Sequence, residues 1–421
     1  MSWTLLVLGL LGVVHAANAI APRDRPLVLL AWSFFSSWLT IELVWHHLAI
    51  GAVTTLVLVS GGALDETPGI VGLVLMAVAL GLMIQIAWTT RRTVVTMRTS
   101  VAELDPGPDA PRFPRSHVVF PLLMGRRSGV RVRRNVPFAR VGGKTLRLDV
   151  TVPSAPAPGG GARRPALMQV HGGGWVIGDK REQGLPLLGH MAAQGWVGFN
   201  VNYRLSPGVG FPDHLIDLKR GLAWIREHAD EYDVDPDFIC ITGGSAGGHL
   251  AALMALTAGD DRFQPGFESA DTRVAAAVPF YGLYDFTTAG AFGRDLEVYK
   301  RFLEPIVMKA FVSDEPEKFE DASPLHHLRE DAPPFLVVHG DRDTLAPVED
   351  ARRFTSALRA ISNQPVLYAE MHGAQHAFEI FPSPRAVRVI EGVERFLSTL
   401  WDRREADQAG AEPAVEAALT S

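Results

Sequence analysis

The sequence predicts an α/β fold, a mostly parallel central sheet flanked by helices, preceded by an N-terminal transmembrane helical region. From residue 130 onward, short apolar runs alternate with segments of helical periodicity, as in chains whose strands return to one sheet through helices. Before residue 98, three apolar blocks contain one acidic residue and no lysine or arginine, which is typical of helices in a bilayer. A chain of 421 residues has room for both parts.

Composition narrows the classes of partner and site. The net charge of −6 gives no reason to expect a nucleic-acid partner. The single cysteine, Cys240, excludes an intramolecular disulfide and a multi-cysteine metal site, and its apolar neighbours predict a small core residue. Neither observation identifies the redox compartment of the protein or its oligomeric state.

The three apolar blocks predict three or four membrane-associated helices. Trp3–Ile20 is almost wholly apolar, and because the triplet at 17–19 (Ala-Asn-Ala) mimics a cleavage site, a secretory signal peptide is the alternative. The absence of Lys and Arg before this block, and the two apolar blocks after it, favour helices that remain in the membrane. Leu27–Leu64 is too long for one span of roughly 20 residues, whereas Ile70–Trp88 has about the right length.

Charges in the connections suggest an orientation. Arg23 lies in the first connection, Asp65 in the second, and Arg91 follows the last block, so the first and third positions favour the cytoplasmic side. The charges agree with this if Leu27–Val44 lies in the interface and only His47–Leu64 helps to span the membrane. We therefore expect an integral membrane protein whose following domain is cytoplasmic. A basic stretch after the last block suits contact with anionic lipid headgroups, or equally a solvated linker: Arg112, Arg115, Arg126, Arg127, Arg131, Arg133 and Arg134.

Glu42, His46 and His47 interrupt the second apolar block. Ionisable residues at membrane depth often mark function, and Glu42 and His46 share one helical face. A metal ion would need more ligands than these three side chains supply. A helix break near Trp45 would instead place all three at the water interface, so a functional role stays open.

The sequence divides into a membrane-anchoring region (1–98), a linker that could contribute to a cap (99–129), a catalytic α/β domain (130–401) with a cap insertion at about 283–331, and a tail (402–421). The tail lacks a clear apolar face and is predicted to be mobile. A helix is predicted around Leu215–Ile225 from its apolar spacing. The predicted strands are Leu167–Val170, Val197–Val201, Phe238–Thr242, Val274–Phe280, Phe335–Val338 and Val366–Ala369.

A nucleophile elbow is predicted at Ser245. The serine follows a predicted strand, precedes a helix-forming run, and has Gly243 two residues before it and Gly247 two residues after it. Small neighbours of this kind let strand and helix close around a serine in strained backbone geometry, which exposes its hydroxyl. A chance match is the alternative, but the position between a strand and a helix disfavours it.

Three consecutive glycines after the first predicted strand suggest an oxyanion hole. The segment runs His171, Gly172, Gly173, Gly174 and Trp175. In acyl transfer the carbonyl oxygen gains negative charge, and backbone N–H groups of Gly173 and Gly174, together with that of Ala246 after the serine, could stabilise it. A flexible turn is the alternative reading of the glycines.

Asp343 and His376 complete a candidate triad in the chain order serine, aspartate, histidine. Each follows a predicted strand, so both are expected at one edge of the sheet. A neutral imidazole can take the proton of Ser245, while a carboxylate on its other nitrogen fixes the tautomer. Asp341 and His372 are the nearby alternatives, and we prefer Asp343 and His376.

With these motifs in place, residues 130–400 resemble the hormone-sensitive-lipase-like esterases of the α/β-hydrolase superfamily. The resemblance is carried by the triple-glycine loop after His171, by the elbow at Gly243–Gly248, and by the stretch Val201–Pro207 followed by Phe211 and Pro212. It implies an α/β-hydrolase fold and a serine carboxylesterase or lipase. Where many members of that family carry an acidic residue before the nucleophile, this chain has Gly244.

The expected reaction is ester hydrolysis through an acyl-enzyme, with Ser245 as nucleophile and no cofactor or metal. The membrane region and the cap favour a lipophilic ester as substrate and membrane lipids as neighbours. An amidase or peptidase could use the same triad, although prolyl-peptidase relatives usually place tyrosine where Ala246 stands. A non-catalytic membrane scaffold that retains the fold is the third alternative.

Overall fold

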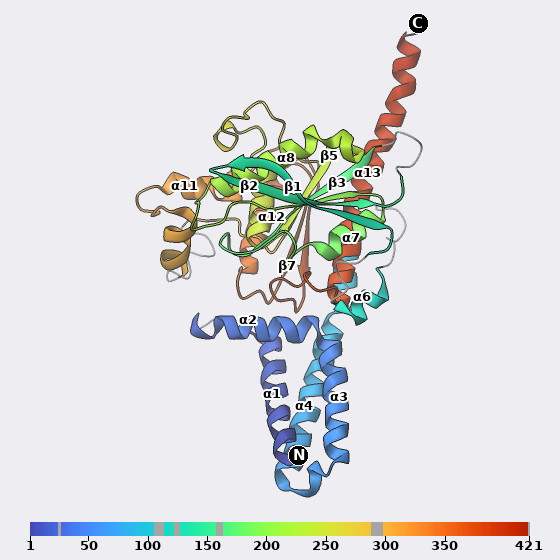
Figure 1. Ribbon diagram of the computed structural model, residues 1–421, viewed down its shortest axis with the longest axis vertical. Helices are drawn as coiled ribbons and strands as arrows, with labels where there is room; N and C mark the ends of the chain where they lie inside the picture. Colours follow the sequence, from blue (N-terminus) through green and yellow to red (C-terminus); the bar gives the residue numbers. More distant parts are fainter. Residues whose placement is uncertain (24–26, 105–112, 122–126, 157–162, 288–297, 420–421) are drawn as a thin grey trace.

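The computed structural model describes the chain except residues 24–26, 105–112, 122–126, 157–162, 288–297 and 420–421. Figure 1 shows a bundle of N-terminal helices at one end, an α/β domain beyond it, and one helix, α2, lying across the bundle where the two parts meet. The C-terminal helix projects from the opposite side of the α/β domain (Figure 1).

The N-terminal helical region consists of α1 (Ser2–Ile20), α2 (Leu27–Glu42), α3 (Val44–Ser60), the short 3₁₀ helix η1 (Ala63–Asp65) and α4 (Thr67–Thr89). Two helical stretches, α1 and Thr67–Leu104, are long and apolar enough to cross a membrane. The pair α2 and α3 passes the same test only together, and it is bent by 84°. The second apolar block is therefore broken, at Leu43, two residues before the position near Trp45 that the sequence suggested.

The arrangement of these helices agrees with the charge pattern. The connection between α1 and α2 and the end of α4 face the α/β domain, whereas the connection between α3 and α4 lies at the far end of the bundle (Figure 1). In the sequence Arg23 follows α1 and Arg91 follows α4, whereas Asp65 is the last residue of η1, between α3 and α4.

Helices α1 and α4 approach closely because glycine lies at their contact. A Cβ atom at Gly72 would clash with the backbone nitrogen of Leu6, and one at Gly9 would lie 2.9 Å from the Cβ of Leu75. Without a hydrophobic effect between helices in lipid, close backbone contact is a main source of packing energy. Gly72 is therefore required by the packing of the bundle.

We expect Gly72→Leu to lower the unfolding temperature of the detergent-solubilised protein, because the side chain would force two backbones apart at a cost of about 1–3 kcal/mol. Gly81→Leu is the matched control, since a Cβ atom at Gly81 on the same helix meets nothing within 4 Å. Thermal unfolding of both variants checks this, and equal unfolding temperatures would contradict the packing.

The α/β domain is built on an eight-stranded sheet in the order β1-β2-β4-β3-β5-β6-β7-β8. The pairs β1/β2 and β2/β4 are antiparallel, and all other pairs are parallel. All six predicted strands are confirmed, and the first two strands were missed. The strands are β1 (Val130–Val141), β2 (Lys144–Pro153), β3 (Arg164–Val170), β4 (Val197–Val201), β5 (Val234–Gly244), β6 (Ala277–Phe280), β7 (Phe335–Gly340) and β8 (Val366–Met371).

Helices cover both faces of the sheet. Alternate strand residues enter two separate cores, as the period of a strand requires: Met168 and Ile241 in one, Leu167 and Cys240 in the other. Cys240 is fully buried, which confirms its prediction as a core residue. The first core contains residues of α8 (Asp213–Glu227), α9 (Ala246–Leu256) and α12 (Val348–Ile361), and the second contains residues of α5 (Arg92–Val101), α7 (Leu185–Ala193) and α13 (Pro384–Leu419). The predicted helix around Leu215–Ile225 is confirmed as α8.

The segment 99–129, in its described part, packs on α13. It contains η2 (Ala102–Leu104) and α6 (Arg115–Val119), and Val101 and Leu104 are buried in the second core. The Ser100 hydroxyl donates to the Tyr368 carbonyl of β8 at 2.8 Å. The N-terminal helical region therefore continues into the α/β domain through packed helices. Of the basic residues between 112 and 134, Arg112 and Arg126 lie outside the described residues, and Arg133 of β1 forms an ion pair with Glu231.

The segment between β6 and β7, for which a cap is predicted, contains the π-helical stretch η7 (Tyr299–Met308), α11 (Pro316–Asp321) and the short helix η8 (Pro324–His326). Part of the predicted cap, 288–297, lies outside the described residues. The tail, predicted to be mobile, forms the end of α13, which continues to Leu419. Ala, Glu and Arg, in which the tail is rich, have high helix propensity, and the mobility of the tail stays a prediction.

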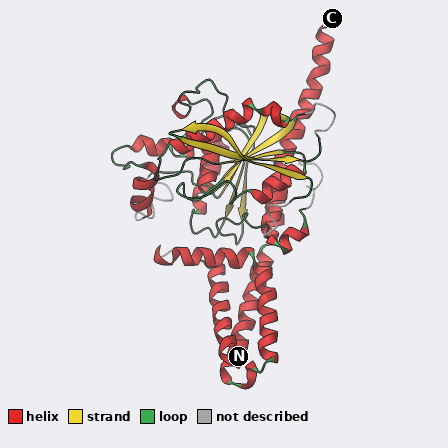
Figure 2. Ribbon diagram, viewed as in Figure 1, coloured by secondary structure: helices red, strands yellow, loops and turns green. Residues whose placement is uncertain are grey.

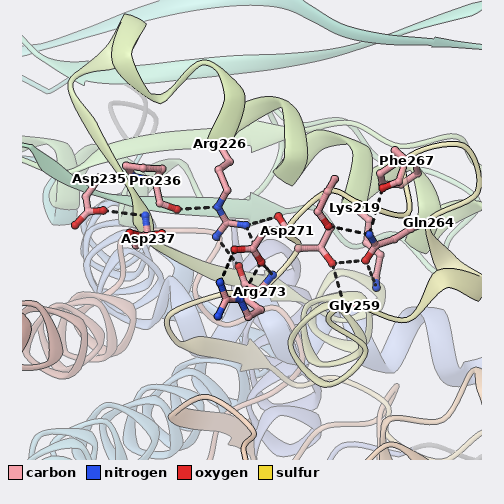
Figure 3. Close-up of polar contacts among 12 residues, drawn as sticks. Lys219, Arg226, Asp235, Pro236, Asp237, Gly259, Gln264, Phe267, Asp271 and Arg273 are labelled. Atoms are coloured by element: carbon pink, nitrogen blue, oxygen red, sulfur yellow. Dashed lines mark hydrogen bonds and ion pairs between the residues drawn. The ribbon is translucent and has the colours of Figure 1, made fainter.

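A polar network ties α8 to the segment that precedes β6. Figure 3 shows Arg226 of α8 between the Pro236 carbonyl, at 2.8 Å, and Asp271. Lys219 Nζ donates to Gln264 Oε1 at 3.3 Å. The Lys219 side chain is fully buried, and burial lowers its pKa to about 8. Two further 3₁₀ turns, η4 (Ala229–Tyr232) and η5 (Asp261–Phe263), lie in the same region. Figure 2 shows the strands of the sheet, in yellow, in the middle of the α/β domain with helices around them.

Candidate active site

Ser245 lies in the sharp turn between β5 and α9, with φ 59° and ψ −123°. Glycine is needed on both sides: a Cβ atom at Gly243 would clash with the Gly247 carbonyl, and one at Gly247 would clash with the Val170 carbonyl. The Ser245 N–H donates to the Phe280 carbonyl of β6 at 3.0 Å, which fixes the turn to the sheet. The backbone geometry is thus the strained one that the glycine spacing predicted.

The triple-glycine loop lies beside Ser245. Gly173 and Gly174 have φ values of 105° and 58°, a region that favours glycine. A Cβ atom at Gly172 would lie 3.0 Å from the Cβ of Ser245. Gly172 N–H donates to Gln183 Oε1 at 2.7 Å. Within the described residues the N–H groups of Gly173, Gly174 and Ala246 make no hydrogen bond, so three amide donors are free near the serine.

His171 contacts the start of this loop and stabilises it. Its ring stacks on Tyr203 with centroids 4.5 Å apart, and its Nδ1 lies 2.8 Å from the Gly172 carbonyl. The ring is buried, and burial lowers the pKa of His171, so it stays neutral. Tyr203 donates through its hydroxyl to the His171 carbonyl at 3.0 Å. These contacts fix the start of the glycine loop, and His171 itself has no place in the proton-transfer chemistry.

The structure brings Asp343 and His376 together at the carboxyl edge of β7 and β8. Nδ1 of His376 lies 2.6 Å from Asp343 Oδ2. The other carboxylate oxygen accepts from the N–H groups of Leu345 and Ala346, both at 2.8 Å. Burial alone would raise the pKa of the Asp343 carboxyl, but the charge of His376 and hydrogen bonds from His339 and His376 outweigh it and hold that pKa well below its usual range. The carboxylate is therefore ionised at neutral pH.

The two alternative residues, Asp341 and His372, pair with each other. His372 Nδ1 lies 2.7 Å from Asp341 Oδ2, and the Gly373 N–H donates to the other oxygen at 2.6 Å. The His372 side chain is 41% exposed, whereas that of His376 is 6% exposed. The same two loops thus carry two Asp–His pairs, and the buried one is the preferred pair.

Tyr281 connects the elbow to His376. Its ring centroid lies 4.4 Å from that of His376, and a Cβ atom at Gly244 would lie 2.5 Å from its hydroxyl oxygen. Within the described residues no hydrogen bond joins the Ser245 hydroxyl to His376. Hydrogen bonds between a nucleophile and its base are often long in structures without substrate. Since Asp343 engages Nδ1, Nε2 is the ring nitrogen that remains for the serine.

Glu379 is a buried acid that the sequence did not point to. It accepts a hydrogen bond from the Tyr281 hydroxyl, and burial raises the pKa of Glu379 to about 7. Tyr281 therefore occupies the space beside Gly244, and its hydroxyl brings Glu379 near this position. Only the position of Glu379 three residues after His376 could have drawn attention to it.

The protonation of Glu379 predicts a pH dependence of stability. The folded protein keeps this proton up to about pH 7, whereas the unfolded chain releases it near the usual value of 4.5. The resulting stabilisation is full below pH 4.5 and is lost as the pH rises through 7. We expect Glu379→Gln, which keeps a neutral side chain of the same shape, to unfold at a higher temperature than wild type at pH 8 and at a similar temperature at pH 5. Unfolding curves across this range check it, and parallel pH profiles would contradict it.

Metal binding at Glu42, His46 and His47 receives no support. Among the described residues no group of three His, Cys, Asp or Glu side chains could hold a metal ion. Glu42 instead pairs with Arg385 at 3.4 Å, and His46 Nε2 contacts the Val119 carbonyl at 3.0 Å. The expectation that a helix break would place all three at the water interface is wrong for Glu42, which is buried against the α/β domain.

The chain is similar to proteins that are named as esterases. Residues 148–358, half of the chain, match the model of the BD-FAE family. The probable carboxylic ester hydrolase LipM of Mycobacterium tuberculosis (strain ATCC 25618 / H37Rv) is 49% identical over 255 residues, which cover 61% of this chain and 58% of LipM. Esterase LipQ of the same organism is 45% identical over 276 residues, covering 66% of this chain and 64% of LipQ. The chain therefore spans about three fifths of the length of these relatives.

The fold is also found in solved esterases. The native structure of the thermophilic esterase Est2 from Thermogutta terrifontis superimposes with a TM-score of 0.53 at 27% identity, covering 63% of this chain and 90% of that chain. Together with the parallel sheet and the elbow, this likeness confirms the α/β-hydrolase fold. The chain belongs to the BD-FAE family, a member of the hormone-sensitive-lipase-like α/β-hydrolases.

Proposed function

We propose that this protein is a serine carboxylic ester hydrolase in which Ser245, His376 and Asp343 form the catalytic triad. The observation that carries the proposal is the buried Asp343–His376 pair, 2.6 Å apart, on the same sheet edge as a serine in an elbow. The names of the relatives LipM and LipQ, a carboxylic ester hydrolase and an esterase, support the same reaction class.

In the proposed mechanism Ser245 Oγ attacks the ester carbonyl while Nε2 of His376 takes the hydroxyl proton. Asp343 holds Nδ1–H and stabilises the imidazolium that forms. The carbonyl oxygen becomes an oxyanion, which the free N–H groups of Gly173, Gly174 and Ala246 stabilise. Collapse of the intermediate breaks the ester C–O bond, and His376 gives its proton to the leaving alcohol. Water, deprotonated by His376, then attacks the acyl-enzyme. The bond between the acyl carbon and Ser245 Oγ breaks, His376 returns the proton to Oγ, and the acid is released.

The substrate is proposed to be a lipophilic ester. Phe302 of η7, in the cap, lies next to the oxyanion loop, since a Cβ atom at Gly174 would lie 3.3 Å from its ring. An aromatic side chain at this place favours an apolar group on the substrate. The N-terminal helices could hold the domain at a bilayer, where such esters are concentrated.

A cytoplasmic position of the α/β domain is proposed from the charges. Arg23 follows α1 and Arg91 follows α4, two helices whose C-terminal ends point toward this domain (Figure 1). Basic residues next to apolar helices favour the cytoplasmic side.

Hydrolysis of p-nitrophenyl esters of rising acyl length, compared with the matching anilides, tests the proposal on the full chain in detergent micelles. We expect the esters to be cleaved, with kcat/KM rising beyond the acetyl ester, and the anilides to be cleaved far more slowly. Anilides cleaved as fast as esters would indicate an amidase or peptidase. Cleavage of neither class, by protein that does not react with a fluorophosphonate, would indicate a scaffold.

A further inference from the structure

The loop that carries His376 is held from outside the α/β domain. This loop, residues 372–383, connects β8 to α13. Figure 1 shows helix α2 of the membrane region lying directly against the α/β domain. The Nε1–H of Trp38 donates to the Ala377 carbonyl at 2.9 Å, and the Phe34 ring lies edge-on to the His376 ring, with centroids 6.2 Å apart. Helix α2 therefore contacts His376 itself and the residue after it.

A second contact fixes the residue before His376. The Gln375 side-chain oxygen accepts from the N–H groups of His376 and Thr344, at 2.9 and 2.8 Å, and its nitrogen donates to the Ser37 hydroxyl at 2.9 Å. The Ser37 hydroxyl uses its one hydrogen on the Ser33 carbonyl, at 2.6 Å, so it can only accept from Gln375. Helix α2 thereby sets which way the Gln375 amide points, and this amide joins the Asp343 and His376 loops.

The backbone of the loop needs such support. Ala377, directly after His376, has φ 61°, a left-handed conformation that is uncommon outside glycine. Residues in this region persist where their surroundings hold them. The Trp38 hydrogen bond goes to the carbonyl of this same residue, and Trp38 also stacks on Phe381, with ring centroids 5.0 Å apart.

The two ends of the loop are fixed by a buried ion pair with α2. Arg385 and Glu42 are both buried, and Arg385 Nε lies 3.4 Å from Glu42 Oε1. Arg385 also donates to the carbonyls of His372 and Gly373, at 2.8 and 3.1 Å, at the start of the loop. The Ser383 hydroxyl, at its end, donates to Glu42. Glu42 thus connects the loop that carries His376 to α2.

We propose that α2 is a positioning element of the active site, through which the membrane region sets the rate of the reaction at His376. This inference rests on the proposed esterase function. Phe34, Ser37 and Trp38 act through the His376 loop and not on the substrate. Displacement of a reacting group by about 1 Å can cost on the order of 100-fold in rate, so small shifts of this loop are sufficient.

The test is a double variant, Ser37→Ala with Trp38→Phe, in the full chain in detergent micelles. It removes both hydrogen bonds to the loop and keeps the aromatic stacking. With p-nitrophenyl acetate, and with rates expressed per active site titrated by a fluorophosphonate, we expect kcat to fall about 10- to 100-fold while KM stays unchanged. Hydrogen–deuterium exchange of residues 372–383 should become faster.

Two matched variants complete the design. Ser37→Thr, which keeps the hydroxyl, should retain wild-type kcat, and Leu39→Ala, on the exposed side of α2, should leave kcat and exchange unchanged. If the wild type is active and the double variant has the same kcat and the same hydrogen–deuterium exchange, the proposed role of α2 is overturned and the proposed function stands. A wild type that cleaves no ester would overturn the proposed function, and this inference with it.

Discussion

Replacement of Ser245 by alanine is expected to reduce ester hydrolysis by at least about 10⁴-fold. In the proposed mechanism Oγ forms the acyl bond, and alanine has no atom that can do so. The fold should tolerate the change, because within the described residues this hydroxyl makes no hydrogen bond and because the turn depends on the neighbouring glycines. Initial rates with p-nitrophenyl butyrate, measured beside thermal unfolding of the same preparations, check both statements.

A second serine provides the control for this variant. Ser313 lies exposed in the cap region, where its hydroxyl donates to Asp314 at 2.8 Å, so Ser313→Ala should keep wild-type activity. A Ser245→Ala protein that unfolds like wild type and retains more than a small fraction of its activity would remove Ser245 from the mechanism.

Asp343→Asn is expected to have the second-largest effect, a fall in kcat of about 10⁴-fold. An amide can donate as well as accept, so it permits the wrong tautomer of His376, and it brings no charge to stabilise the imidazolium. Its oxygen can still accept from the N–H groups of Leu345 and Ala346, so the loop should keep its geometry. Steady-state kinetics should show this loss in kcat.

The chain carries its own control for this substitution. Asp341→Asn makes the same chemical change two residues away, in the partly exposed pair with His372. We expect it to leave kcat within a small factor of wild type. If Asp341→Asn were the inactive variant and Asp343→Asn the active one, the two pairs would exchange roles, and His372 would become the proposed base.

The sequence could predict the elbow and the glycine loop because their geometry is local. Gly243 and Gly247 are required by contacts within a few residues and with the adjacent strand, and Gly173 and Gly174 by their own positive φ angles. The pairing of the Asp and His residues was harder to predict. Asp341 and Asp343 both follow β7, and His372 and His376 both follow β8, so spacing alone could not decide which pair is buried.

The first strand, β1, was missed for a different reason. Most residues of β1 are exposed, and several are arginines, because this strand lies at the edge of the sheet and pairs on one side only. An edge strand of this kind lacks the apolar run from which the buried strands were recognised.

The contacts of α2 could not be predicted from sequence. Ser37 and Gln375 are 338 positions apart, and neither residue lies in a motif. The only local signal was Glu42, an acidic residue in an otherwise apolar block, and it suggested membrane-depth chemistry. In the structure its partner, Arg385, comes from the far end of the chain, and the pair is a junction between the two parts of the molecule.

The central claim, that Ser245 is the nucleophile activated by His376, is tested most directly by mapping a covalent adduct. The full-length protein would be treated with a fluorophosphonate, digested and analysed by mass spectrometry. We expect a single phosphonylated residue, Ser245, and no adduct in the Ser245→Ala protein. Labelling at another residue, or equal labelling of both proteins, would contradict the account.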